Sequence, residues 1–133
     1  MPKTPFTEKE LNQFETLLKE RKEELFKSIQ LKKEMDQTID KDGDMADLAS
    51  GLLEEEMALS LSEQDQRLLG EINDALERIE NKTYGLCIDT GETIVKARLN
   101  IMPYAKRTAS AQELFDRKEK NKKLLSKFRS SSY

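Results

Sequence analysis

The chain has little of what most enzymes and secreted proteins need. Among its 133 residues there is no histidine and no tryptophan, a single cysteine, three prolines and five glycines. One cysteine excludes an internal disulfide, and the absence of histidine leaves no Ser/His/Asp triad. No segment approaches the roughly 18–20 apolar residues of a membrane span, and residues 1–10 lack the apolar core of a signal peptide. We therefore expect a cytoplasmic protein that is neither an enzyme nor a membrane protein.

Charge dominates what is present. Charged residues make up 37% of the chain and hydrophobic residues 36%, a balance that favours an elongated helical protein over a compact globule. Residues 40–92 hold 4 basic and 15 acidic side chains, a net charge of −11, whereas residues 93–133 hold 11 basic and 3 acidic ones, a net charge of +8. This asymmetry argues against direct DNA binding over most of the chain, and it suits a protein that orients itself in a charged cavity or groove.

Two long segments carry apolar residues at helical spacing. The first opens with the capping-box pattern Thr7 to Glu10 and fades near residues 36–40. The second is expected to begin between residues 44 and 47 and to continue without interruption to about residue 82. The positions that define the two stripes are Leu11, Phe14, Leu18, Leu25 and Ile29 in the first, and Leu69, Ile72, Leu76 and Ile79 in the second. Two amphipathic helices joined by a short connection predict an antiparallel coiled-coil hairpin, so the fold class is mostly α.

The acidic connection TIDKDGDMAD looks at first like a calcium-binding loop. Asp40, Asp42 and Asp44 occupy the first, third and fifth positions of an EF-hand pattern. The sixth position, however, is Met45 instead of glycine, and the twelfth is Gly51 instead of a bidentate glutamate. The loop lacks both its sharp turn and its clamp, so a calcium sensor is kept only as an alternative that calorimetry with Ca²⁺ would test.

Beyond residue 82 the helical pattern gives way to a small irregular globule. Gly85, Gly91 and Pro103 punctuate it, and Thr93 to Val95 are β-branched. We expect the globule to pack around Leu86, Ile88, Ile94, Leu99, Ile101 and Tyr104. A second capping-box pattern, Ser110 to Glu113, then opens a C-terminal helix that ends in a frayed tail. The predicted parts are the hairpin, residues 1–82, the globule, residues 83–111, and the C-terminal helix and tail, residues 112–133.

Three motifs occur in a fixed order along the chain. The first is D-x-x-D-x-A at residues 44–49, the second is EINDALERIENKTYGLC at residues 71–87, and the third is GETIVKARLNIMP at residues 91–103. Each is weak alone, but their order and ungapped spacing over roughly residues 7–125 resemble the DksA/TraR family. Members of this family are bacterial regulators that bind RNA polymerase.

The resemblance implies how such a protein works. The hairpin would enter the secondary channel of RNA polymerase and place Asp44, Asp47 and Ala49 near the active site. There it would modulate promoter open complexes, as in the stringent response, and the protein would act as a monomer. N-capping of a helix is the alternative role for the two aspartates. The other readings kept open are a channel factor that acts on stalled elongation and a helical-hairpin adaptor without a polymerase role.

The sequence departs from the family at its zinc site. Zinc-binding members carry C-x-x-C twice, and the four positions are here Cys87, Thr90, Thr108 and Ala111. A structural zinc site needs four Cys or His ligands, so the resemblance implies a zinc-independent member without a cofactor. The expected globule is held by apolar packing and turn hydrogen bonds, with Cys87 as a buried structural thiol or, alternatively, a redox sensor.

A second departure concerns guanosine tetraphosphate, which well-studied members hold at the polymerase interface with basic residues. The three principal basic positions fall here at Glu71, Met102 and Gln112, and none of these is basic. Nearby cations that could substitute are Arg98, Lys106 and Arg107. We therefore expect weak or no dependence on the nucleotide.

The C-terminal helix is rich in cations. Its basic residues are Arg117, Lys118, Lys120, Lys122, Lys123, Lys127 and Arg129. They could dock against an acidic polymerase surface, or they could form a solvated helix face, and both readings are kept.

Overall fold

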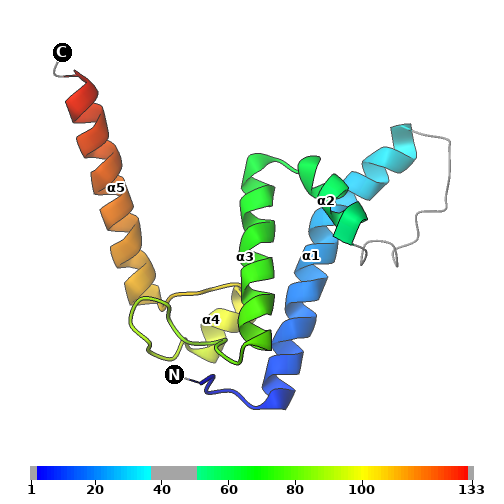
Figure 1. Ribbon diagram of the computed structural model, residues 1–133, viewed down its shortest axis with the longest axis horizontal. Coiled ribbons are helices and arrows are strands. Elements are labelled where there is room, and N and C mark those ends of the chain that lie inside the picture. Colours follow the sequence, from blue (N-terminus) through cyan, green and yellow to red (C-terminus); the bar gives the residue numbers. More distant parts are fainter. Residues whose placement is uncertain (1–2, 37–50, 132–133) are drawn as a thin grey trace.

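The computed structural model describes residues 3–36 and 51–131. Its helices are α1 (Glu8–Asp36), α2 (Gly51–Leu59), α3 (Glu63–Glu80), α4 (Lys96–Ile101) and α5 (Ala109–Ser131). Figure 1 shows α1 and α3 side by side as the arms of a hairpin, with α2 across the far part of α1. The short helix α4 lies in the globule at the base, and α5 projects away from it. The expected mostly α fold is confirmed, and none of the described helices is both long and apolar enough to cross a membrane.

The predicted capping box at the start of α1 is present. The backbone N–H of Glu10 donates to the Thr7 hydroxyl at 3.2 Å, and the N–H of Thr7 donates to the Glu10 carboxylate at 3.1 Å. These reciprocal bonds satisfy backbone donors that have no partner within the helix. The helix then buries its apolar stripe, in which Leu11, Phe14 and Leu18 all face the core.

The prediction of an unbroken second helix is wrong. The chain leaves the helix between Leu59 and Glu63, and a new helix begins with Ser62 as its N-cap. The Ser62 hydroxyl accepts a hydrogen bond from the backbone N–H of Asp65 at 3.2 Å. The pattern Ser62-x-x-Asp65 is itself a helix-start signal, because a serine hydroxyl competes with the helix for backbone donors. Leu61 turns inward at the break and packs with Phe26, Met57 and Leu69 in a separate small cluster.

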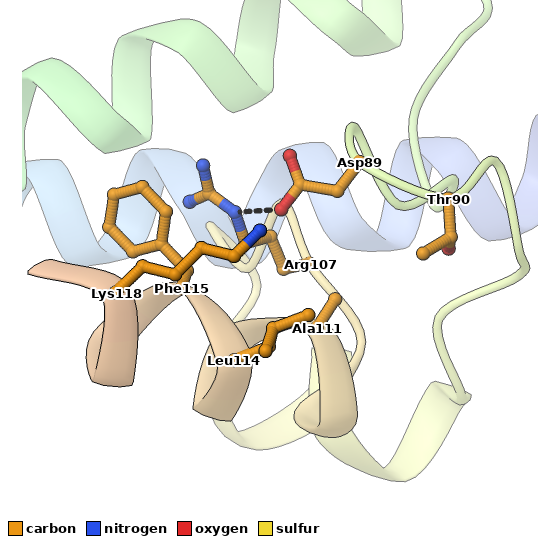
Figure 2. A pocket seen from close by; sticks show the side chains of 7 residues that line it. All are labelled: Asp89, Thr90, Arg107, Ala111, Leu114, Phe115 and Lys118. Atoms are coloured by element: carbon orange, nitrogen blue, oxygen red, sulfur yellow. Dashed lines mark hydrogen bonds and ion pairs between the residues drawn. The ribbon is translucent and has the colours of Figure 1, made fainter.

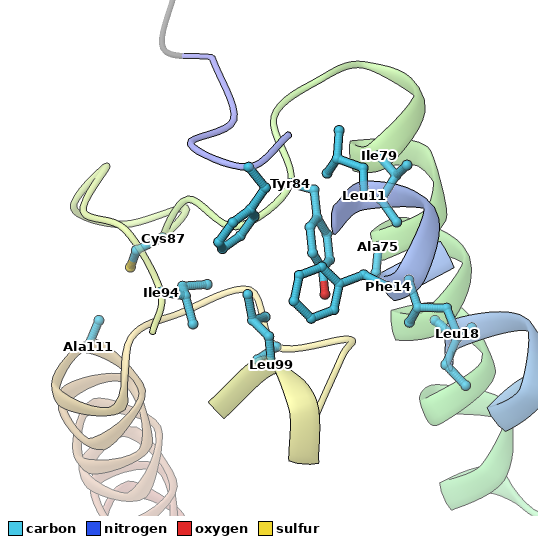
Figure 3. Packing of buried hydrophobic residues seen from close by; sticks show 13 residues of the cluster. Leu11, Phe14, Leu18, Ala75, Ile79, Tyr84, Cys87, Ile94, Leu99 and Ala111 are labelled. Carbon is cyan, nitrogen blue, oxygen red and sulfur yellow. The ribbon is translucent and has the colours of Figure 1, made fainter. Parts of the chain in front are cut away.

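The hairpin base and the globule share one core, shown in Figure 3. Leu18 from α1 and Ile72 and Ala75 from α3 are fully buried where the two arms meet. Tyr84 joins this seam to the globule, since its ring centroid lies 5.3 Å from that of Phe14. The globule is therefore an extension of the hairpin core and shares its stability.

The expected packing of the globule is only partly right. Ile94 and Leu99 are buried as predicted. Ile88 and Ile101 are instead 51% and 75% exposed, which corrects that part of the prediction. Irregular segments have no repeating period that assigns side chains to an inner face, so apolar character alone misplaced these two residues. The largest buried side chain of the globule is Tyr84, which was not among the candidates.

The C-terminal helix starts slightly earlier than its sequence pattern suggested. Thr108 provides the cap, because its hydroxyl accepts a hydrogen bond from the backbone N–H of Ala111 at 3.2 Å. Ser110 lies inside the first turn of α5 and is exposed. The capping box predicted at Ser110 is therefore replaced by a cap at Thr108, one of the four positions that correspond to zinc ligands in the family.

Candidate functional site

The predicted hairpin tip lies outside the described residues. This applies to Asp44, Asp47 and Ala49 and to the calcium-loop pattern that overlaps them. The described helices that precede and follow the tip in the sequence are α1 and α2. They are joined by an ion pair in which Lys22 Nζ lies 2.6 Å from Glu54 Oε1. The roles of the three tip residues stay predictions.

The globule contains two short knuckles that correspond to the two C-x-x-C motifs. In the first, residues 87–90, the Cys87 carbonyl accepts a hydrogen bond from the Gly91 N–H at 2.9 Å. The second, residues 108–111, is the capped first turn of α5 described above. The Ile88 N–H donates to the Lys106 carbonyl at 2.9 Å, which draws the two knuckles together. Cys87 and Ala111 are buried, whereas Thr90 is exposed.

The Cys87 thiol sits among hydrogen-bond donors. Burial raises the pKa of this thiol, but the Thr90 hydroxyl and the backbone N–H groups of Thr108, Thr90 and Asp89 outweigh burial and lower the pKa from 9.0 to about 7. Hydrogen bonds of this kind favour the charged thiolate over the neutral thiol. The knuckles thus keep donors directed at one sulfur and bring three of the four predicted positions, Cys87, Thr90 and Thr108, around it.

The side chains at these positions do not fit a zinc ion. Structural zinc requires four sulfur or nitrogen donors in a tetrahedron. Here Cys87 offers one thiol, Thr90 and Thr108 offer hydroxyls, and Ala111 offers a methyl group. Over residues 3–36 and 51–131 there is also no group of three or more His, Cys, Asp or Glu side chains that could hold a metal ion. These positions therefore do not supply the metal cross-link that zinc forms between the knuckles of a C4 finger.

The thiol predicts a stability that depends on pH. Because the pKa of Cys87 is lowered to about 7, folding favours the thiolate as the pH rises from about 7 to 9, and this contribution is lost as the pH falls through about 7. The chain has no histidine, so no other side chain has an ordinary pKa inside this window. We expect the free energy of unfolding, measured by urea titration under reducing conditions, to rise across it. Cys87→Ala should give a flat profile, and a wild-type profile equally flat would contradict the prediction.

The three cations named as possible nucleotide or polymerase contacts lie together with the three positions that are basic in other family members. All six positions line one small depression of about 120 Å³ between α3, the segment after α4 and α5; they are Glu71, Arg98, Met102, Lys106, Arg107 and Gln112. Arg98 donates from Nε to the Arg107 carbonyl at 3.1 Å. The Arg107 guanidinium is paired with Asp89, which leaves it less available for a phosphate. Whether a nucleotide binds here stays a prediction.

The pairing of Asp89 with Arg107 was missed by the sequence analysis. Arg107 Nε donates to Asp89 Oδ2 at 2.7 Å beside a second depression of about 410 Å³, shown in Figure 2. Asp89 lies within the first knuckle and Arg107 directly precedes the second. An acid in one knuckle and a cation beside the other is a signal present in the sequence, but spacing alone does not reveal that they meet.

Comparison with known proteins finds a matching family model, similar sequences and similar solved structures. The family model described as prokaryotic dksA/traR C4-type zinc finger matches residues 82–117. The RNA polymerase-binding transcription factor DksA of Caulobacter vibrioides is 32% identical over 118 residues, which cover 87% of this chain and 83% of that protein. Among solved structures, the transcription factor DksA2 from Pseudomonas aeruginosa has a TM-score of 0.59 at 33% identity, covering 85% of this chain and 88% of the other. The transcriptional regulator Dks from Chlamydia trachomatis has a TM-score of 0.55 at 30% identity, covering 85% and 94%.

A helical hairpin with a two-knuckle globule at its base defines a class of coiled-coil proteins with a finger-like domain. The chain belongs to the DksA/TraR family. The resemblance read from the three sequence motifs is thereby confirmed. The family model describes a C4-type zinc finger, which has four cysteine ligands. This globule differs from that description because Cys87 is the one cysteine of the chain.

Proposed function

We propose that this protein binds RNA polymerase and regulates transcription, acting through the secondary channel and without zinc. The observation that carries the proposal is the similarity to the Caulobacter transcription factor over 83% of that protein, hairpin and globule together. A similarity confined to the finger would support only a shared small domain. The hairpin is the part that could reach an enclosed active site, so its inclusion matters for the function.

The hairpin has suitable dimensions for entering a narrow channel. The 29 residues of α1 form a rod about 43 Å long at 1.5 Å per residue. In the proposed mechanism this rod delivers Asp44 and Asp47 to basic or polar groups near the polymerase active site. If the tip is helical, two carboxylates three residues apart would project from one side of the turn, and Ala49 would keep the tip slim. The tip would act by charge and hydrogen bonding, so the protein would be a regulator without catalytic activity of its own.

The proposed function requires neither guanosine tetraphosphate nor sequence-specific binding to DNA. Glu71 lines the depression where basic residues of other members would hold guanosine tetraphosphate, and its carboxylate would repel phosphate. Lys106 and Arg98 offset this only in part, so dependence on the nucleotide would be weak or absent. The protein would recognise the polymerase as a monomer and would not bind DNA in a sequence-specific manner.

The proposal is tested by the lifetime of open complexes at a ribosomal RNA promoter. We expect the wild-type protein, purified with a chelator, to shorten the lifetime with or without guanosine tetraphosphate. Asp47→Asn should restore the lifetime, because it removes one tip charge while keeping the side-chain shape. Glu23→Gln is the matched control, since it removes one exposed acid from the arm α1 and should behave as the wild type.

The possible outcomes separate the alternatives. A wild-type protein that leaves the lifetime unchanged, or an Asp47→Asn variant that shortens it fully, would contradict the proposed mechanism. Cleavage or release of backtracked RNA by a protein without effect on open complexes would favour the elongation factor. Failure to bind polymerase at all would favour the adaptor.

A further inference from the structure

One thiol cannot provide the metal cross-link that joins the two knuckles of a C4 finger. In a C4 finger a single metal ion joins the knuckles, because each contributes two thiolates to the same ion. Here Cys87 is the one possible thiolate, and the second knuckle presents Thr108 and Ala111. The Ile88 to Lys106 backbone hydrogen bond connects the same regions, but one such bond has a modest net effect on stability.

An ion pair spans the position between the knuckles. Asp89 lies between Cys87 and Thr90 in the first knuckle, and Arg107 directly precedes Thr108 in the second. Arg107 Nε lies 2.7 Å from Asp89 Oδ2, and the side chains are 9% and 43% exposed, respectively. Because the arginine end is buried, solvent screens this pair less than it would screen a surface pair.

Arg107 also contacts the C-terminal helix α5 and the short helix α4. Its guanidinium carbon lies 3.8 Å from the ring centroid of Phe115 on α5, within the range of a cation–π contact. Its carbonyl accepts the Arg98 hydrogen bond from α4. Among the described residues Arg107 is the one charged side chain in the buried class, and a buried charge is stable only when it is paired. Figure 2 shows Asp89 and Phe115 beside the same guanidinium.

We propose that Asp89, Arg107 and Phe115 form a clamp that replaces the zinc ion as the cross-link between the knuckles. This inference rests on the proposed function in one respect, namely that the protein acts without zinc. Asp89 and Arg107 act as positioning residues, because they fix the start of α5 relative to the globule and the hairpin base. A clamp of this kind is weakened by salt and by the loss of either charge, whereas a metal cross-link is broken by chelators.

The first test is the melting temperature in the presence of EDTA. Asp89→Asn should lower it by about 3–6 °C, because a chain of this size shifts by a few degrees per kcal/mol. Raising NaCl to about 1 M should lower the wild-type value only part of the way to that of Asp89→Asn, since salt screens the more exposed Asp89 end of the pair and affects its buried Arg107 end less. Glu92→Gln is the matched control, because it removes an exposed acid of the same loop that does not contact Arg107. It should resemble the wild type at both salt concentrations.

The second test observes the clamp directly. In a ¹H–¹⁵N spectrum the Arg107 Nε–H should exchange slowly with water and be shifted by the Phe115 ring. Asp89→Asn and Phe115→Leu should each remove this signal from its wild-type position, and Glu92→Gln should leave it there. A general loss of stability would broaden many signals without moving this one selectively.

The outcomes keep the inference separate from the zinc-free proposal. Stoichiometric zinc in protein purified without chelator, with a melting temperature that falls on adding EDTA, would overturn both. Indifference to EDTA together with equal behaviour of Asp89→Asn and Glu92→Gln would overturn the clamp alone. Neither measurement requires polymerase, so a failure of polymerase binding would leave the clamp unaffected.

Discussion

Tyr84→Ala is expected to lower the free energy of unfolding by about 3–5 kcal/mol, the usual cost of truncating a fully buried aromatic residue. Tyr84 has no exposed surface and lies between the hairpin seam and the globule. Its ring centroid is 5.3 Å from that of Phe14 and 6.3 Å from that of Phe6. Removal of the ring would therefore loosen α1, the N-terminal segment and the globule together. Urea unfolding followed by circular dichroism at 222 nm would measure the loss.

The hydroxyl of Tyr84 makes a separable contribution. It donates to the Pro103 carbonyl at 2.7 Å, and both residues are buried. Burial raises the pKa of Tyr84 well above its usual value, with Arg78 opposing this shift, so the hydroxyl remains a neutral donor at and above neutral pH. Tyr84→Phe should cost about 1–3 kcal/mol, because it leaves a buried carbonyl without its donor.

Tyr104→Phe is the matched control for the hydroxyl. Tyr104 is only partly buried in the same globule, so the change should alter the free energy of unfolding by less than about 0.5 kcal/mol. Equal losses for the two Tyr→Phe variants would contradict the role given to the Pro103 hydrogen bond.

The sequence predicts the hairpin well where its helices are periodic. Leu11, Phe14 and Leu18 recur at helical spacing, and the structure buries them against Ile72 and its neighbours on α3. Helical periodicity is a local property, so residues a few positions apart are enough to detect it. The break before α3 was missed because the apolar pattern on either side of Ser62 suggested continuity.

The globule was harder to predict for a physical reason. Its contacts join positions far apart in the sequence through segments without a period, as in the hydrogen bond between Thr4 and the Tyr84 carbonyl. The same holds for Asp89 and Arg107, which are eighteen residues apart in two irregular segments. The zinc-ligand positions could be identified because the family motif fixes them. The residues proposed to compensate for zinc lie between and beside those positions, where the motif imposes nothing.

Gly85→Ala is expected to cost about 2–5 kcal/mol, combining the strain of a positive φ with overpacking. Gly85 has a φ of 89°, a conformation that side chains with a Cβ rarely adopt. A Cβ at this position would also overlap the Phe6 ring, far inside van der Waals contact. The Phe6 ring centroid also lies 5.4 Å from that of Phe14 and 6.3 Å from that of Tyr84, so displacement of the ring would disturb these contacts.

Two other glycines separate the causes. Gly91 has a φ of 76° but open space around its Cβ position, so Gly91→Ala should cost only the strain, about 1–2 kcal/mol. Gly70 lies within α3 in open space, and Gly70→Ala should stabilise the protein by about 0.5–1 kcal/mol. The difference between Gly85→Ala and Gly91→Ala, measured by urea unfolding, then reports the cost of displacing Phe6. If the two variants lose equal stability, Phe6 moves freely and the N-terminal segment is not part of the core that supports the globule. A larger loss at Gly85 means that residues 4–6 take part in holding the globule on the hairpin base.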